Sequence, residues 1–378
     1  MKLRGRYSLL NMSSTMQQLD LRARQALFWP AQYQQWRMNP MRLDARPQAQ
    51  YIGFFNLIWL VANDVIVGIA LAKFLRDHAD ELARALFALA NRVLGHTVEE
   101  MLLWLHAWPG GIKLNAELNF FLGQLFFWML GLWYITMKAV EPWLPTVVWW
   151  IGTSGFFGVS FSLALFSDVY TLIVVHINVF YLVAAKIYYW QRAALVSLFN
   201  LFRGKRYNIL RRRVDNANYG LDQLLLGTIM FTLLAFLFPT TLVYYVCFLG
   251  FRVVSTVVHA SIEALLAFVN HFPLFAIMLR FKDHRRLPGG IAIEYGMVGH
   301  DAVVKRDGTL SSPPSSPSLP LLEIHNKPIS FGNIFYQYRH LLGRFQRHYF
   351  SRNTLRALIR GETFGRLSRV NYPTIPRS

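Results

Sequence analysis

Long apolar runs separated by basic segments constrain this chain more than any other feature of its sequence. A bilayer core of about 30 Å is crossed by about 20 mainly apolar helical residues, and lipid tolerates no unpaired backbone groups. The runs that approach this length are 54–71, 118–137, 143–166, 169–185, 223–251 and 253–279. They predict an all-α polytopic membrane protein, a bundle of about six transmembrane helices within residues 51–279.

The composition agrees with a membrane protein. Hydrophobic residues make up 54% of the 378 positions and charged residues only 16%, below the roughly 25% of soluble domains. The net charge of +19 would also suit a nucleic-acid binder, but the Lys and Arg residues lie between or beyond the apolar runs. A membrane surface is therefore the expected partner, and nucleic acid is not. The single cysteine, Cys247, lies in an apolar run, so no disulfide framework, cysteine metal site or cofactor is expected.

The charge distribution predicts the orientation. Six of the eleven residues from Arg203 to Arg213 are Lys or Arg, inside a basic loop over 191–219. The tail from Arg280 to Ser378 carries 16 Lys and Arg against six Asp and Glu. Because basic loops stay in the cytosol, six spans would place this loop and both termini on the cytosolic side.

Two segments outside the main runs have mixed character. Residues 1–50 are basic, and within them Met16–Trp36 fits either an amphipathic helix at the membrane interface or a solvated surface helix. Residues 82–113 are moderately apolar, contain charges and end at Trp108-Pro109-Gly110-Gly111, so we interpret this stretch as re-entrant or interfacial.

The tail divides into three parts. Residues 280–310 form a short cytosolic segment, with a hairpin expected over 290–310 around Asp307-Gly308. Residues 311–320 are a Pro and Ser linker that is expected to be disordered. Residues 321–378 contain Ile, Phe, Tyr and Leu at helical spacing among Arg and His, which predicts basic amphipathic helices that lie on anionic lipid or dock on a partner.

Ionisable residues inside membrane runs are costly, so each one suggests a function. The candidates are Asp64, His176, and the pair His259 and Glu263 one helical turn apart. A proton relay or transport path is one interpretation. The structural interpretation, which we favour, is that each side chain pairs with a polar group on a neighbouring helix or partner subunit.

Enzyme motifs are largely missing from the sequence. It contains no GxGxxG followed by a helix, no Walker loop, no HExxH and no GxSxG. Strands and helices of adequate length do not alternate, so no doubly wound nucleotide-sugar domain is expected. Catalysis by this chain alone is therefore not expected.

Two polar constellations remain as candidate lipid or partner contacts. In the first, which includes Trp108, Lys113 and Asn115, glycines permit a tight turn and Lys113 is placed to meet a lipid phosphate; a plain turn is the alternative. The second is polybasic, and orientation alone would also explain its charge. Its members are Arg203, Lys205, Arg206, Arg211, Arg212 and Arg213. Asp222 and Gln223 lie at the start of the expected span over 223–251. They are candidates either to cap that helix, since a helix N-terminus favours a carboxylate, or to pair with the basic loop.

Three segments carry a resemblance to a known family. The run SLFNLFRGKRYNILRRRVDNANYGLDQLLLGTIMFTLLAFLFP, from Ser197 to Pro239, resembles the signature of the Q-type subunit of the phosphatidylinositol N-acetylglucosaminyltransferase complex. WPGGIKLNAELNFFLG, Trp108 to Gly123, is similar to an earlier motif of that family, and Lys327 to Glu362 is similar to its C-terminal one. The resemblance covers roughly residues 52–365.

The resemblance implies a role in the first step of glycosylphosphatidylinositol (GPI) anchor synthesis. That step transfers N-acetylglucosamine from its UDP sugar to phosphatidylinositol on the cytosolic face of the endoplasmic reticulum. The family's Q-type subunit stabilises the complex, while another subunit, a glycosyltransferase, carries the catalytic site. A non-catalytic scaffold is therefore the leading hypothesis. Two alternatives are a transporter or lipid scramblase that uses Asp64, His176 and Glu263, and sugar transfer by this chain itself.

Overall fold

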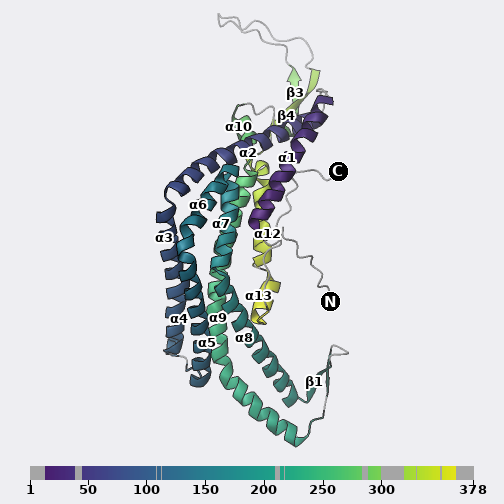
Figure 1. Cartoon of the computed structure of the whole chain (residues 1–378). Coiled ribbons are helices and arrows are strands. Elements are labelled where there is room, and N and C mark those ends of the chain that lie inside the picture. The colour runs from purple at the N-terminus through teal and green to yellow at the C-terminus, as the bar shows by residue number, and fades with distance from the viewer. Residues whose placement is uncertain are drawn as a thin grey trace, which may run out of the picture. The chain divides into compact units, whose positions relative to one another are not determined.

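The computed structural model shows a mostly helical chain (Figure 1). It describes residues 13–38, 45–107, 109–111, 113–208, 213–216, 218–282, 288–298, 319–328, 330–349 and 351–362. The longer helices are α1 (Ser14–Met38), α2 (Ala45–Asp77), α3 (Ala79–Ala90), α4 (Thr97–His106), α5 (Ala116–Val140), α6 (Leu144–Ser154), α7 (Val159–Ile173), α8 (Val175–Phe202), α9 (Leu221–His271) and α12 (Tyr336–Tyr349). The shorter elements are helices α10 (Leu274–Lys282), α11 (Phe331–Ile334) and α13 (Arg352–Ile359) and strands β1 (Lys205–Asn208), β2 (Arg213–Asn216), β3 (Pro288–Val298) and β4 (Leu319–Pro328).

The chain divides into two compact units. The larger unit comprises Met1–Ala31, Val61–Asn270 and Gly343–Ser378, and the smaller comprises Gln32–Leu60 and His271–Leu342. In the smaller unit β3 pairs antiparallel with β4, and the Phe55 and Phe275 rings stack with centroids 5.9 Å apart. The candidate site residues described below belong to the larger unit.

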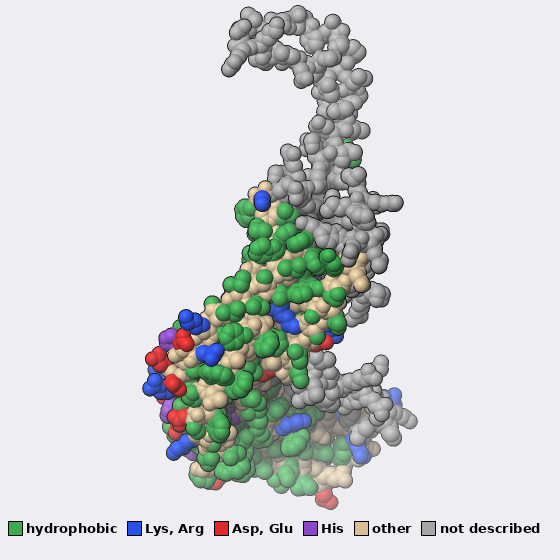
Figure 2. Space-filling model, turned by 45° about the horizontal axis from the view of Figure 1, so that its top comes forward, with side chains coloured by type: hydrophobic (Ala, Val, Ile, Leu, Met, Phe, Trp, Pro, Cys, Tyr) green, Lys and Arg blue, Asp and Glu red, His purple; other side chains and the backbone are tan. Residues whose placement is uncertain are grey.

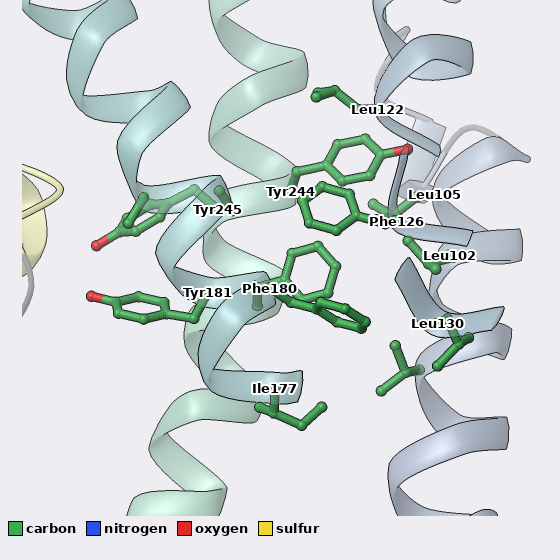
Figure 3. Packing of buried hydrophobic residues seen from close by; sticks show 14 of the residues in the cluster. Leu102, Leu105, Leu122, Phe126, Leu130, Ile177, Phe180, Tyr181, Tyr244 and Tyr245 are labelled. Atoms are coloured by element: carbon green, nitrogen blue, oxygen red, sulfur yellow. The ribbon is translucent and has the colours of Figure 1, made fainter. Parts of the chain in front are cut away.

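An aromatic core joins three helices of the larger unit (Figure 3). The Phe126 ring of α5 lies 5.9 Å from Phe180 of α8, and 5.8 and 4.3 Å from Tyr244 and Phe248 of α9, measured between centroids. Lipid tails are as apolar as these side chains, so van der Waals packing rather than exclusion of water holds such helices together in a bilayer. Interlocking rings supply that packing because they make many contacts at fixed geometry.

Glycines let α2 approach the α6–α7 junction closely. A Cβ added to Gly155 would lie 2.6 Å from the carbonyl oxygen of Gly68, and one added to Gly152 would lie 3.0 Å from Cβ of Leu75. Small residues at a helix contact allow such a close approach of two backbones.

Three described helical stretches are long and apolar enough to cross a membrane. They are Phe54–Asp77, Ala116–Phe157 and Leu221–His271, and a fourth results if α7 and α8, which meet at a 46° bend, count as one crossing. Figure 2 shows hydrophobic side chains over much of the face in view, as lipid or partner helices require. The structure thus supports a helical membrane protein, whereas the predicted number of six spans is not reached.

The breaks between helices differ from those predicted. The expected span over 143–166 is interrupted at Gly158, whose φ of 125° favours glycine, and the expected span over 169–185 contains the bend at Val174. The runs 223–251 and 253–279 do not form two spans, because α9 continues through Arg252, whose side chain donates a hydrogen bond to Asn178. The break comes instead just before Pro273, which has no backbone N–H to donate.

The amino-terminal and tail segments make contacts that the sequence does not predict. Helix α1 is bonded to α2 and α7, whereas its position relative to lipid stays a prediction. The hairpin predicted within 290–310 is wrong. The first strand, β3, pairs instead with β4, a strand beyond residue 310, and Ile293 lies opposite Ile324. Most of the predicted linker 311–320 lies outside the described residues, and its last two residues begin β4. Between 82 and 113 the chain forms α3, a π-helical turn (Asn91–His96) and α4, which packs on α5.

We predict that Gly68→Ala destabilises the protein. The added methyl would overlap the backbone around Gly155, and overpacking of this kind costs about 1–3 kcal/mol. The melting temperature of the detergent-purified protein should fall by several degrees. Gly131→Ala, in the interior of α5 and with open space around the new Cβ, is the matched control and should leave the melting temperature unchanged or raise it, since alanine favours a helix more than glycine does. Equal melting temperatures for the two variants would contradict the close helix approach.

Candidate partner and lipid interface

Asp64 is the centre of an ionic contact that fastens α1 to the membrane helices. Its carboxylate accepts hydrogen bonds from the Ser160 backbone N–H at 2.9 Å and the Ser160 hydroxyl at 2.7 Å, and it pairs with the Arg22 guanidinium. The Asp64 and Arg22 side chains are only 1% and 15% exposed. Burial lowers the pKa of Arg22, while Asp64 acts in the opposite direction. Arginine nevertheless keeps its proton at neutral pH, so the pair is ionic.

A second carboxylate holds the start of α1. Asp168 of α7 accepts hydrogen bonds from the backbone N–H groups of Ser14 and Thr15 at 2.7 and 3.0 Å, and from the Ser13 hydroxyl at 2.6 Å. The first N–H groups of a helix have no partner within it, and the helix dipole favours a negative charge there. Asp168 therefore caps α1, and two carboxylates far away in sequence hold this helix in place.

The other intramembrane candidates have partners within the chain. The ring nitrogens of His176 lie 3.0 and 3.3 Å from the carbonyl oxygens of Ile173 and Leu94. His259 lies 3.2 Å from Glu263 on the next turn of α9. The structure thus places Asp64, His176 and the His259–Glu263 pair in separate contacts and does not bring them together.

The turn between α4 and α5 is fixed to α9 by polar side chains. Asn115 caps α5 by accepting a hydrogen bond from the Leu118 N–H at 2.9 Å, and its own N–H donates to the Thr240 hydroxyl at 3.0 Å. One turn on, Asn119 accepts a hydrogen bond from the Tyr244 hydroxyl at 2.8 Å. Lys113 is exposed at this turn, and Trp108 lies outside the described residues. The turn therefore presents a cation while its neighbours are locked to α9.

The polybasic segment forms a hairpin at the end of the α8–α9 pair. Strand β1 pairs antiparallel with β2, and Arg203 and Arg206 are exposed. Asp215 is occupied within the hairpin by Arg213 and Asn208, at 2.7 and 3.0 Å. One carboxylate, that of Asp215, therefore faces several Lys and Arg residues, so the hairpin keeps a net positive charge. Arg211 and Arg212 lie outside the described residues, and Lys205 is half-buried. Asp222 and Gln223 are exposed in the first turn of α9.

Two tyrosines that the sequence did not single out as site residues hold the carboxyl end of α13. The hydroxyl of Tyr245 donates to the Leu358 carbonyl at 2.7 Å, and that of Tyr188 donates to the Ile359 carbonyl at 3.1 Å. The last carbonyls of a helix have no partner within it, so the Tyr188 hydroxyl provides a donor for the Ile359 carbonyl. The Tyr245 hydroxyl is a second donor for the Leu358 carbonyl, which also accepts from the Gly361 N–H at 3.0 Å. The two partner carbonyls lie 171 positions from Tyr188 and 113 positions from Tyr245, so no local sequence pattern indicates these contacts.

These features define a helical membrane protein with a basic hairpin and a tightly anchored amino-terminal helix. A family model described as N-acetylglucosaminyl transferase component (Gpi1) matches residues 16–289. The chain therefore belongs to the Gpi1 family.

Curated relatives agree with this family. The chain is 38% identical over 357 residues to the N-acetylglucosaminyl-phosphatidylinositol biosynthetic protein gpi1 of Schizosaccharomyces pombe, across 94% of this chain and 53% of that protein. It is 33% identical over 401 residues to the phosphatidylinositol N-acetylglucosaminyltransferase subunit GPI1 of Saccharomyces cerevisiae, across 98% of this chain and 63% of that protein. Mouse subunit Q is 36% identical over 255 residues, 67% of this chain and 42% of that protein. The chain thus spans about half to just under two thirds of the yeast relatives. No solved structure matches it.

We predict that Asp64→Asn strongly destabilises the protein, because it leaves the Arg22 charge buried without its partner. Breaking a buried pair in this way costs about 3–5 kcal/mol. The comparison is the exposed Arg24–Asp20 pair, whose loss through Asp20→Asn should cost at most about 1 kcal/mol. Melting temperatures of the purified variants measure both effects. If Asp64→Asn melts no lower than Asp20→Asn, the anchoring role of Asp64 is wrong.

We also predict that Tyr245→Phe loosens α13 without unfolding the core. The phenyl ring keeps its packing, but the Leu358 carbonyl loses its hydrogen bond to α9 and retains the one from the Gly361 N–H, so amide hydrogen exchange across 352–361 should accelerate. Tyr189→Phe removes the hydroxyl of an exposed tyrosine on α8 and serves as the control. Exchange that is equal in the two variants would show that this hydrogen bond does not hold α13.

Proposed function

We propose that this chain is a non-catalytic, stabilising subunit of a membrane complex that transfers N-acetylglucosamine from UDP-N-acetylglucosamine to phosphatidylinositol. This is the first step of GPI-anchor synthesis. The observation that carries the proposal is the similarity, over nearly the whole chain, to proteins named as a subunit of phosphatidylinositol N-acetylglucosaminyltransferase or as a biosynthetic protein of its product. The expected partners are the other subunits, including the glycosyltransferase subunit that performs the transfer.

The surface of α9 supports a role in assembly. Its amino-terminal half leaves large apolar side chains open, with Leu225, Ile229 and Phe236 being 65%, 65% and 79% exposed. Apolar patches of this extent mark contacts with lipid or with other proteins. Glycines, and polar pairs such as Asp64 with Arg22, meanwhile hold the remaining helices together. The chain therefore combines internally packed helices with exposed apolar helix faces, as a scaffold requires.

The basic hairpin is proposed to face the cytosolic leaflet of the endoplasmic reticulum. Positive loops remain on the cytosolic side, and each Lys or Arg near an anionic surface contributes about 1 kcal/mol of attraction. Arg203, Lys205 and Arg206 would attract phosphatidylinositol or an acidic partner surface, and Arg211, Arg212 and Arg213 extend the same charge. Lys113 is proposed to add a further cation for lipid phosphate.

The charge pattern alone would place the hairpin and both termini on the cytosolic side, but a single crossing by α9, which follows the hairpin, would place the carboxyl-terminal tail opposite the hairpin. We therefore propose the cytosolic side for the hairpin and the amino terminus, as an arrangement of three crossings gives. An arrangement of six spans would require the chain to turn back within the membrane near Arg252, whereas α9 is continuous there. Its 51 residues extend about 76 Å, far more than one bilayer crossing. Part of α9 would thus lie outside the hydrocarbon core or against a partner.

Asp64, His176, His259 and Glu263 are proposed to be structural. Each of these side chains contacts a polar group of this chain, as a role in helix packing requires. Transport or lipid scrambling would need several of these groups along one path. We therefore prefer the scaffold over a transporter.

Affinity purification tests the proposed function directly. Tagged chain is isolated from membranes, the proteins that accompany it are identified, and the eluate is assayed with UDP-N-acetylglucosamine and phosphatidylinositol. We expect the other transferase subunits and transferase activity in the eluate. Recovery of the chain alone, in an extract whose activity stays entirely in the unbound fraction, would overturn the proposal.

The double variant Lys205→Gln/Arg206→Gln tests the role of the hairpin. Because the variant removes two charges that contribute about 1 kcal/mol each near an anionic surface, the apparent KM for phosphatidylinositol should rise by up to about thirtyfold, with subunit recovery unchanged. Lys138→Gln, which removes an exposed charge from the end of α5, is the control. An unchanged KM in the double variant would exclude lipid attraction by the hairpin, and loss of partner subunits would indicate a protein contact instead.

A further inference from the structure

Helix α13 has two different faces. Thr354, Ala357 and Leu358 are partly buried, and Gly361 just beyond the helix is fully buried. This spacing of three and four residues places them on the side that packs on the protein. The packing is close, since a Cβ on Gly361 would lie 2.7 Å from the Tyr188 ring, and its φ of 70° favours glycine. The orientation of α13 is therefore fixed, and so is the face that it turns outward.

The outward face carries two parallel strips. Arg352, Arg356 and Arg360 are exposed and follow one another at intervals of four residues, so they form a basic strip. Leu355 and Ile359, 59% and 61% exposed, form an apolar strip beside it. Helix α13 contains no acidic residue, and Glu362 beyond its end lies 4.0 Å from Arg360. A basic strip beside an apolar strip is typical of helices that lie in a membrane interface.

The attachment point of α13 gives a second indication of an interface. Tyr188, which donates to the Ile359 carbonyl, begins the run Tyr188-Tyr189-Trp190 on α8, and Tyr189 and Trp190 are 37% and 66% exposed. Amphipathic rings in such a belt prefer the level of the lipid headgroups. The Tyr188 and Tyr245 rings stack with centroids 4.6 Å apart, which ties α8 and α9 together at the same point. Helix α13 is thus held where an anionic headgroup would be in reach.

From these observations we propose that α13 is an anionic-lipid binding element. Leu355 and Ile359 insert at the edge of the acyl region, and Arg352, Arg356 and Arg360 contact lipid phosphates. The two tyrosine hydroxyls hold the helix in this position. Lipid binding therefore does not have to include the loss of conformational entropy that ordering a free helix would cause. The element would bind lipid whether or not the chain belongs to a transferase.

The test uses the full chain in nanodiscs of phosphatidylcholine alone or of phosphatidylcholine mixed with phosphatidylserine. A nitroxide is attached at Leu355→Cys in a Cys247→Ala background, and its accessibility to oxygen and to a water-soluble nickel complex is compared. We expect the oxygen-to-nickel ratio to rise several-fold in the anionic nanodiscs. In Arg352→Gln/Arg356→Gln/Arg360→Gln this rise should disappear.

Two controls keep the result specific. The triple variant Arg84→Gln/Arg92→Gln/Lys138→Gln removes the same number of exposed charges elsewhere and should retain the rise. Circular dichroism confirms that each variant is folded. A nitroxide that stays accessible to nickel in both lipids, or is equally shielded in both, would overturn the proposal. A rise that survives in the α13 triple variant would overturn it as well.

Discussion

The ion pair between Arg22 and Asp64 is the contact on which the arrangement of the amino-terminal helices depends. A carboxylate on an apolar helix is tolerated only with a partner, and a buried arginine likewise. The pair forms because Gly68, Gly155 and Gly158 let α2 approach the start of α7 closely enough for Ser160 to reach the same carboxylate. Close backbone packing and charge pairing therefore support each other, and α1 is held to the membrane helices as a result.

The same rule, that polar groups must be satisfied inside the chain, explains the contacts at the other end of the helices. Asn119 and Tyr244 join α5 to α9, and Tyr188 and Tyr245 provide donors for the last carbonyls of α13. Satisfied in this way, the helices form a rigid frame. The positive charges of the β1–β2 hairpin and of α13, by contrast, are exposed on the surface. Both proposed lipid contacts rest on this exposure.

The sequence predicts the helices well and their breaks poorly. Apolar length identifies membrane helices because lipid itself selects for it, but it cannot show that α9 continues through Arg252, since that depends on Asn178 of α8. Asp64 is recognisable as a residue that needs a partner. Its partner Arg22 is 42 positions away, in a segment whose sequence fits an interfacial or a solvated surface helix. Likewise β3 finds its partner in β4, beyond the turn signal at Asp307-Gly308. Contacts between distant segments decide each of these points, and no local pattern records them.

The central claim is that the chain holds a transferase together without performing the transfer. The most direct measurement compares cells with and without this chain for two quantities: the amount of assembled complex that contains the catalytic subunit, and the transferase activity per assembled complex. The account predicts that loss of the chain lowers the amount of complex, while the activity of each complex that still assembles stays the same. A complex that assembles in full but has lost its activity would contradict the account and assign this chain a catalytic role.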